Sequence, residues 1–415
     1  MNFKQKMSEL WKKRISLKET VSGKENEEDS PISSIMEYKE RIRAHKKKVL
    51  LYTAGAAAGC VLLLVGGKIL IDKWTYNGYK VVTETVQEDT ISTKYTKFGD
   101  NILKYGGDEV SLLDRQGNAL WNEPQTMDNP SVDICGEYCV VYDKSATVMT
   151  VFNMEGKAGS IQTGLPVVKA RVASQGVVAA VLEDGETTWI NVYNVNGEEI
   201  VTGKTRVDSP GYPVDLSISD DGLLMAVSYL KVEDHKPASY VAFYNFGNIG
   251  QNQMDNMVSG YTYTDTLVPD VEYMGNSRAV AFRDNGFVIY QGRQIPEESV
   301  AVEVEDEILA VFCDDSYIGM VFRDTEGESA YRMEIYNSRG KLKCTAGVDV
   351  AFDHISISKD QVLLYNTNEF AVYSMKGTCR YQGALQEGNI RSFFKIARNR
   401  YMAVLDGGIE TIKLG

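Results

Sequence analysis

Hydrophobic and polar positions follow two different patterns along the 415-residue chain. Residues 49–67 carry no charge and are mostly apolar, so they predict a helix roughly 29 Å long at about 1.5 Å per residue. From residue 80 onward, short apolar runs alternate with polar turns, which is typical of β-strands. The pattern predicts one long apolar helix followed by an all-β region.

The apolar helix has the length of a transmembrane span, because the hydrocarbon core of a bilayer is about 30 Å thick. Lys68 can extend its charged end to the interface, so the predicted span covers residues 49–71. Basic clusters that precede a span stay in the cytoplasm. The residues that set this orientation are Arg41, Arg43, Lys46, Lys47 and Lys48. We therefore expect a single-pass plasma-membrane protein that contacts the lipid bilayer through residues 49–71, with its N-terminus inside.

Residues 1–48 form the expected cytoplasmic tail, in which 13 basic and 8 acidic side chains give a net charge of +5. Apolar residues at helical spacing between positions 3 and 15 predict a short amphipathic helix, and residues 19–32 are an acidic linker. Within the span, the spacing of Gly55 and Gly59 permits close helix pairing and hence a homodimer. Residues 72–79 are expected to link the span to the all-β region outside the membrane.

The all-β region repeats a hairpin motif. The motif follows β-rich runs and consists of an aromatic or aliphatic residue, a polar residue that is often Asn, two variable positions and Gly. It is clearest at residues 152–156, 193–197 and 336–340. Asn-x-x-Gly between such runs is typical of a β-hairpin turn, because Gly readily adopts positive φ. The glycines of successive copies lie 37 to 50 residues apart: Gly117, Gly156, Gly197, Gly247, Gly292, Gly340 and Gly377. A second polar turn precedes each copy, so each repeat contains four strands.

Four-stranded units at a period of about 40–45 residues predict a β-propeller. Counting third strands gives eight blades over residues 80–415, with seven as the alternative if the first or last unit is degenerate. The last unit, residues 408–414, has no outer strand after it. Residues 80–86 alternate in polarity and can supply that strand, which would close the ring and remove its open edges.

The repeats SISDDGLLMAVS and WINVYNVNGEEI resemble those of WD40-like and quinoprotein-like propellers. The layout of a basic tail, one apolar helix and Tyr-Asn-x-x-Gly repeats resembles an uncharacterised family of single-pass Gram-positive bacterial surface proteins, a domain of unknown function. This resemblance implies a fold and a location and brings no catalytic residues. The Trp-Asp dipeptide of true WD40 repeats is absent from these positions.

Catalytic motifs are sparse in the sequence. The three histidines, His45, His235 and His354, fall in no H-E-x-x-H pattern, and neither G-x-S-x-G nor a P-loop occurs. The acidic pairs at residues 220–221 and 314–315 would suit calcium only if their loops converged, and we interpret them as solvated turns. Cys135 and Cys139 flank a tight turn and are a candidate disulfide. We expect no catalytic residues, no metal and no cofactor.

The fourth repeat is the most irregular. It contains a polar insertion at residues 231–238, which includes His235, and a long stretch at residues 248–270, which includes Tyr261 and Tyr263. Loops on a rigid scaffold carry binding residues, and exposed Tyr is a common anchor for a partner. These three residues are the candidate binding surface. The alternative is that the tyrosines alternate along an outer strand and cover the neighbouring blade.

A formal net charge of −13 disfavours nucleic acid as a partner. Together, the anchor, the repeats and the scarcity of catalytic motifs predict a non-catalytic binding or scaffold module for an envelope protein or cell-wall ligand. One alternative is a signal-relay subunit that couples outer binding to the cytoplasmic helix. A second alternative is an envelope enzyme, which would need a polar cluster at the propeller channel that sequence alone cannot locate.

Overall fold

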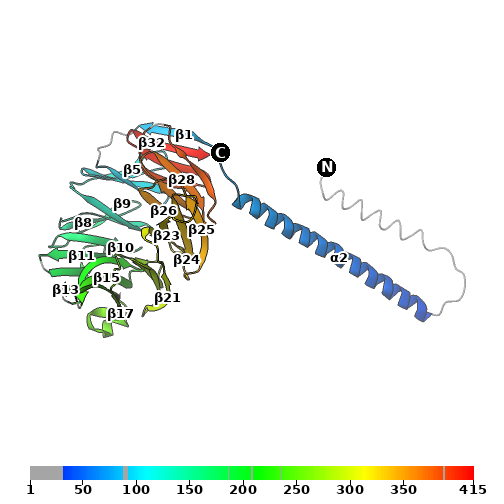
Figure 1. The fold of residues 1–415 in the computed structure, drawn as a ribbon, viewed down its shortest axis with the longest axis horizontal. Coiled ribbons are helices and arrows are strands. Elements are labelled where there is room, and N and C mark those ends of the chain that lie inside the picture. Colours follow the sequence, from blue (N-terminus) through cyan, green and yellow to red (C-terminus); the bar gives the residue numbers. More distant parts are fainter. Residues whose placement is uncertain (1–30, 87–91, 186, 207–208, 234, 387) are drawn as a thin grey trace. The chain divides into compact units, whose positions relative to one another are not determined.

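The computed structural model describes residues 31–86, 92–185, 187–206, 209–233, 235–386 and 388–415. The chain divides into two compact units, Met1–Ile71 and Asp72–Gly415 (Figure 1). The amphipathic helix and most of the acidic linker predicted near the N-terminus lie outside the described residues.

The first unit contains α2 (Pro31–Asp72), an uninterrupted helix of 42 residues. It begins with Pro31, which suits a helix start because the missing N–H has no intrahelical partner there. The basic cluster from Arg41 to Lys48 is exposed on this helix.

No helix in the described part of the chain is long and apolar enough to cross a membrane. This finding contradicts the predicted single-pass plasma-membrane localisation. The lipid contact through residues 49–71 and the homodimer through Gly55 and Gly59 depended on that crossing and lose their support.

The second unit is a propeller of eight four-stranded antiparallel sheets, numbered here as blades in chain order (Figure 1). Blade 1 contains β2 (Lys94–Phe98), β3 (Asn101–Tyr105), β4 (Glu109–Leu113) and β5 (Ala119–Pro124). Blade 2 contains β6 (Pro130–Cys135), β7 (Tyr138–Asp143), β8 (Val148–Asn153) and β9 (Gly156–Gln162). Blade 3 contains β10 (Val167–Val172), β11 (Val178–Asp184), β12 (Thr187–Tyr193) and β13 (Glu199–Arg206).

Blade 4 contains β14 (Tyr212–Ile218), β15 (Leu224–Glu233), β16 (Lys236–Asn245) and β17 (Met257–Thr264), with short 3-10 helices η1 (Gly250–Asn252) and η2 (Met254–Asn256) before β17. Blade 5 contains β18 (Asp270–Tyr273), β19 (Arg278–Arg283), β20 (Gly286–Gln291) and β21 (Glu297–Glu303). Blade 6 contains β22 (Ile308–Cys313), β23 (Tyr317–Arg323), β24 (Tyr331–Asn337) and β25 (Leu342–Val348). Blade 7 contains β26 (His354–Ser358), β27 (Gln361–Tyr365), β28 (Glu369–Ser374) and β29 (Cys379–Ala384).

Blade 8 joins the two ends of the propeller. It combines β30 (Ile390–Ala397), β31 (Arg400–Leu405) and β32 (Gly408–Leu414) with β1 (Tyr79–Val86) as its outermost strand. The β1–β32 register runs antiparallel from Tyr79 opposite Leu414 to Val86 opposite Gly408. The predicted eight blades and the closing strand are therefore confirmed, and the alternative of seven is excluded.

The repeated Asn-x-x-Gly motif forms the turn between the third and fourth strands of a blade. In blade 3, the side-chain oxygen of Asn194 accepts the backbone N–H groups of Asn196 and Glu198, both at 3.0 Å. Gly197 has φ +86°, and a Cβ there would lie 2.7 Å from the carbonyl oxygen of Ser160 in blade 2. The position thus requires Gly for both its backbone angle and its contact with the next blade.

The core lies between neighbouring blades rather than inside a single sheet. Between blades 3 and 4, for example, Val181 and Val192 pack with Leu216 and Val227 in one buried cluster. Middle strands such as β11 are buried along most of their length, because neighbouring blades cover both of their faces. The first strands of the blades border the central channel, and the fourth strand of each sheet lies at its outer edge.

Candidate functional site

One cavity lies on the central channel, and another lies between the outer parts of blades 3 and 4. The channel cavity has a volume of about 460 Å³ and is bordered by the first strands of blades 2 to 7. Its charged lining residues are Asp133, Arg171, Asp220, Asp270, Glu272, Asp314 and Asp315. The cavity therefore holds six carboxyl groups and one guanidinium.

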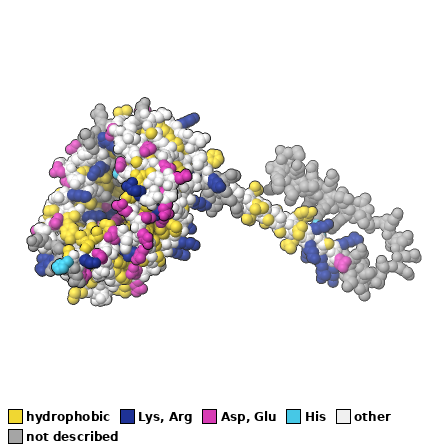
Figure 2. Space-filling model, in the orientation of Figure 1, with side chains coloured by type: hydrophobic (Ala, Val, Ile, Leu, Met, Phe, Trp, Pro, Cys, Tyr) yellow, Lys and Arg dark blue, Asp and Glu magenta, His cyan; other side chains and the backbone are white. Residues whose placement is uncertain are grey.

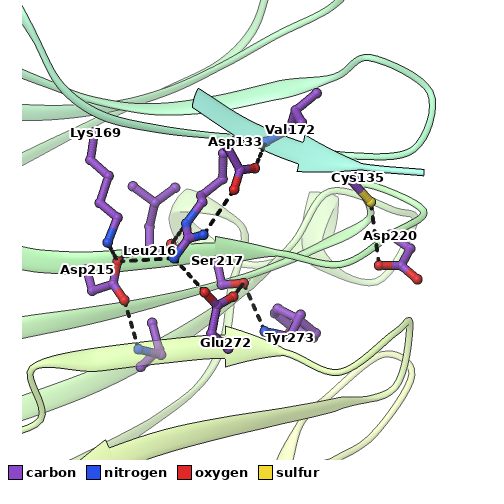
Figure 3. A network of polar contacts seen from close by, with 12 residues as sticks. Asp133, Cys135, Lys169, Val172, Asp215, Leu216, Ser217, Asp220, Glu272 and Tyr273 are labelled. Atoms are coloured by element: carbon purple, nitrogen blue, oxygen red, sulfur yellow. Dashed lines mark hydrogen bonds and ion pairs between the residues drawn. The ribbon is translucent and has the colours of Figure 1, made fainter. Parts of the chain in front are cut away.

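Arg171 on β10 connects four blades through its contacts with Asp133, Leu216 and Glu272, which are labelled in Figure 3. Its Nη1 lies 3.0 Å from Asp133 Oδ1 in blade 2, and its Nη2 lies 2.6 Å from Glu272 Oε1 in blade 5. Its Nε donates to the carbonyl oxygen of Leu216 in blade 4 at 3.1 Å. Burial lowers the pKa of Arg171, but Glu272, Asp133 and Asp215 raise it by more, so the guanidinium stays charged.

A second carboxyl pair lies beside this guanidinium. Asp215 on β14 is buried, forms an ion pair with Lys169 and accepts the backbone N–H of Val271 at 2.9 Å. Burial, followed by hydrogen bonding to Asp215, raises the pKa of Asp270 to about 8. Asp270 is therefore largely protonated at neutral pH and serves as a hydrogen-bond donor. Most of the charge around Arg171 is compensated within the protein.

Three members of the acidic pairs that we interpreted as solvated turns, Asp220, Asp314 and Asp315, line the same channel cavity. Asp220 and Asp315 come from blades 4 and 6, and burial and then the charge of Asp315 raise the pKa of Asp220. Among the described side chains, however, no group of three or more His, Cys, Asp and Glu could hold a metal ion. The cavity is acidic at this end without forming a cation cage.

Cys135 and Cys139 do not come together. Cys135 Sγ lies 3.6 Å from Asp220 Oδ1 on the channel side (Figure 3). Cys139 is fully buried and pairs with Ile134 across the β6–β7 hairpin. This register places the two side chains on opposite faces of blade 2. Both are free thiols, and burial raises the pKa of each to about 12.

The second cavity is a groove of about 650 Å³ between β13 of blade 3 and the outer half of blade 4. Figure 2 shows hydrophobic side chains gathered on the part of the propeller where Figure 1 labels β13, β15 and β17. The blade 4 wall carries Tyr229, Tyr240 and Tyr244. The hydroxyls of Tyr229 and Tyr244 lie 2.7 Å apart, and burial raises the pKa of Tyr244 to about 12. All three phenols therefore stay neutral at physiological pH.

The opposite wall of the groove is β13 itself. Residues 201–205 line the groove without a break, and Ile190 lies beneath them on β12. Lys204 and Lys231 are the basic lining residues, and Asp255 is the acidic one. Lys204 Nζ lies 5.3 Å from the centre of the Trp189 ring, and Lys231 pairs with Glu233 at 3.2 Å. The groove thus has an aromatic wall, a backbone wall and a charged rim.

The fourth repeat does build this groove, but with other residues than the predicted surface. Tyr261 donates to the carbonyl oxygen of Pro296 at 3.1 Å, and Tyr263 bonds to the hydroxyl of Tyr290. Both pack toward blade 5, whereas Thr262 between them lines the groove. His235 is exposed at the tip of the β15–β16 hairpin with φ +64°. Strand alternation was the available signal, but the sequence did not say which face meets the groove.

No curated protein matches the sequence. Solved structures with a similar fold include Sqt1 from Saccharomyces cerevisiae, at 11% identity and a TM-score of 0.53 over 83% of this chain and 99% of that chain. Chaetomium thermophilum Sqt1 bound to the N-terminus of the ribosomal protein L10 matches at 10% identity and a TM-score of 0.53, over 81% and 100%. BamB from Moraxella catarrhalis matches at 10% identity and a TM-score of 0.48, over 81% and 100%.

At such low identity, the Sqt1 structures bear on the fold alone, and they confirm the WD40-like propeller that the repeats predict. The model of a family of unknown function, DUF5711, matches residues 72–414. That range takes in every blade and most of the chain, and the chain belongs to this family.

Proposed function

We propose that the propeller is a non-catalytic binding module and that the groove between blades 3 and 4 receives a segment of a partner protein. The observation that carries this proposal is the groove itself, a cavity of about 650 Å³ with the partly exposed Tyr240 and Tyr244 along one wall and the buried Tyr229 behind them. Tyrosine offers a large apolar ring and a polar hydroxyl, which is why it is frequent at the energetic centres of protein interfaces.

The irregular elements of blade 4 support the same conclusion. The ten-residue strands β15 and β16 are the longest of the propeller's described strands, and they carry Tyr229, Lys231, Tyr240 and Tyr244 along the groove. The segment with η1 and η2 adds Asp255, and β17 adds Met257. Binding residues concentrate where loops and extensions depart from a rigid scaffold.

One structure of similar fold also supports a protein partner. Chaetomium thermophilum Sqt1 is bound to the N-terminus of the ribosomal protein L10. A protein of similar fold therefore binds a terminal segment of another protein. The relay alternative depended on a membrane crossing and is not carried forward.

The proposal is tested by site-specific photo-crosslinking of the full chain in its native cells. A benzophenone amino acid replaces Thr262, which is exposed and lines the groove. The matched control replaces Thr345, which is exposed on the outer strand of blade 6. We expect a discrete protein adduct from position 262 that is absent at position 345. The same adducts at both positions, or none at either, would contradict the proposal.

Chemistry in the channel is the second candidate, and one observation favours it. The pKa of Asp270, raised to about 8, lies in the range that suits a general acid or base. The test is turnover of chromogenic ester, phosphate and glycoside substrates by the full chain and by Asp270→Asn. Activity that disappears in the variant, with the fold intact, would favour an enzyme over the binding module.

A further inference from the structure

We infer that the partner segment binds as an added β-strand along the free edge of β13, extending blade 3 from four strands to five and placing alternate side chains in the groove. This inference rests on the proposed function and goes beyond it, because the groove could also receive a loop or a helix. Strand addition predicts which backbone groups of the partner are used.

The first argument is the hydrogen-bonding capacity of β13. It is the last strand of its sheet and pairs with β12. Its last residue, Arg206, is bridged to Pro210, so among the described residues the open part of its edge is 199–205. On an edge strand, alternate N–H and C=O groups point away from the sheet and can pair with another chain. Strand addition uses these groups for affinity and the neighbouring side-chain pockets for specificity.

The second argument is that the free edge and the groove coincide. Residues 201–205 of β13 all line the groove, so a strand laid along this edge would border it over its length. The outer strand of blade 4 contributes only Met257 and Thr262 to the lining. The groove therefore follows β13 rather than β17, and blade 3 is the sheet that would be extended.

The third argument is Gly203 in the middle of β13. Its φ lies outside the left-handed region, and a Cβ would have a single neighbour within 4 Å, the Ile190 carbonyl oxygen at 3.4 Å. The fold leaves room for a side chain here, so packing within blade 3 does not require Gly. Gly inside a strand often marks a place where another backbone approaches closely.

The groove also specifies the chemistry of the partner. Side chains on one face of a strand repeat about every 6.8 Å, so alternate residues of the added strand would face Tyr240 and Tyr244, which are partly exposed. These neighbours suit apolar or aromatic side chains. Lys231 already pairs with Glu233, whereas Lys204 on β13 is exposed and lines the groove, which favours a carboxylate beside Lys204. The expected partner is an extended segment that alternates apolar residues with polar ones, at least one of them acidic.

The experiment uses peptides selected from a random 12-residue phage library against the full chain. Binding is then measured by fluorescence anisotropy to the wild type, to Thr262→Trp, which would fill the groove, and to Thr345→Trp as the matched control. Each selected peptide is also made with single N-methyl groups at successive positions. N-methylation removes one backbone donor and leaves the side chains in place.

Strand addition predicts an alternating result. Methylation at every second position weakens binding about tenfold, the equivalent of one lost hydrogen bond at roughly 1.4 kcal/mol, and methylation at the intervening positions has little effect. Gly203→Val weakens binding by a similar factor, and Thr345→Val does not. If Thr262→Trp abolishes binding but N-methylation shows no alternation, strand addition is wrong and only binding in the groove is supported. The same conclusion follows if Thr262→Trp abolishes binding and Gly203→Val binds normally. If no selected peptide responds to Thr262→Trp, the proposed function itself fails.

Discussion

Blades 3 and 4 carry polar groups at their inner strands, which border the channel, and at their outer strands. These two ends of the blades differ in whether their polar groups are already paired with other groups of the protein. At the channel, Arg171 contacts Asp133 and Glu272, and Lys169 contacts Asp215. At the outer end, the free edge of β13 faces a groove of about 650 Å³. Buried charges that satisfy one another hold blades together, whereas an open edge beside a cavity is a surface for another chain. Interblade stabilisation is therefore assigned to the channel network, and the open outer end agrees with the proposal that a partner binds there.

The largest expected effect comes from breaking the channel network. Arg171→Leu leaves Asp133 and Glu272 without their cation in a largely buried site, which should lower the free energy of unfolding by about 3–5 kcal/mol. Urea unfolding followed by tryptophan fluorescence measures this loss. Arg115→Leu is the control, because its ion pair with Asp100 is exposed and should contribute less than about 1 kcal/mol. Equal losses in the two variants would remove the distinction between the two ends.

The next effect concerns the pH dependence of stability. Asp270 holds its proton in the folded state up to a pH of about 8, because its pKa is raised from an ordinary value of 3.8. Between these values the folded state binds more protons than the unfolded state, so the free energy of unfolding falls as pH rises and levels off above about 8. The contribution of one proton is at most about 1.4 kcal/mol per pH unit.

Asp270→Asn should remove this slope, because Asn resembles the protonated carboxyl and does not titrate. Urea unfolding at pH 5, 6, 7 and 8 should show the variant gaining stability relative to the wild type as pH rises. Asp406→Asn is the control, since the pKa of Asp406 is lowered by Arg391 and it should contribute no slope in this range. Parallel pH profiles for wild type and Asp270→Asn would show that the buried pair is not protonated as described.

Two glycines of blade 3 give a smaller contrast. Gly197→Ala places a Cβ at φ +86° and 2.7 Å from Ser160 O, which should cost about 1–3 kcal/mol of stability. Gly203→Ala meets neither restriction and should lie within about 0.5 kcal/mol of wild type or be slightly stabilising. Thermal and urea unfolding of the two variants make the comparison. A loss at Gly203 as large as that at Gly197 would mean that the fold, and not a partner, requires Gly203.

Much of the fold follows from the sequence because its signals are local. In an Asn-x-x-Gly turn, a side chain such as that of Asn194 accepts hydrogen bonds from the turn's own backbone. Residues 80–86 alternate in polarity like a strand and follow no other strand in the sequence, which indicated that they pair with the end of the chain. The channel network could not be predicted in this way. Arg171 and Glu272 are separated by 101 residues, and only the closed ring brings them together. The one signal was the presence of two charged residues, Lys169 and Arg171, within the otherwise apolar first strand β10.

The membrane prediction was wrong, and the predicted residues Tyr261 and Tyr263 lie toward blade 5, for different reasons. Hydropathy read over residues 49–71 suggested a span, whereas the described part of the helix has no segment long and apolar enough to cross a membrane. The irregular fourth repeat did indicate the groove, but strand β17 has two faces. Tyr261 and Tyr263 cover blade 5 and Thr262 lines the groove, and this choice depends on how blades pack, which no local pattern encodes.

The smallest expected effect tests this choice of face with two Tyr→Phe variants of blade 4. Tyr261→Phe removes the hydrogen bond to Pro296 O between blades 4 and 5, so it should cost about 1 kcal/mol of stability and leave binding of the groove-selected peptides unchanged. Tyr240→Phe removes a hydroxyl whose described partner is Met257 Sδ at 3.5 Å on the groove, a weak acceptor. It should change stability by less than about 0.5 kcal/mol and weaken binding of those peptides several-fold. Each variant removes one oxygen atom from the wild type, so the two are directly comparable. If Tyr261→Phe weakened peptide binding and Tyr240→Phe lowered stability instead, the binding face of blade 4 would be the one toward blade 5. That result would support the predicted surface of Tyr261 and Tyr263.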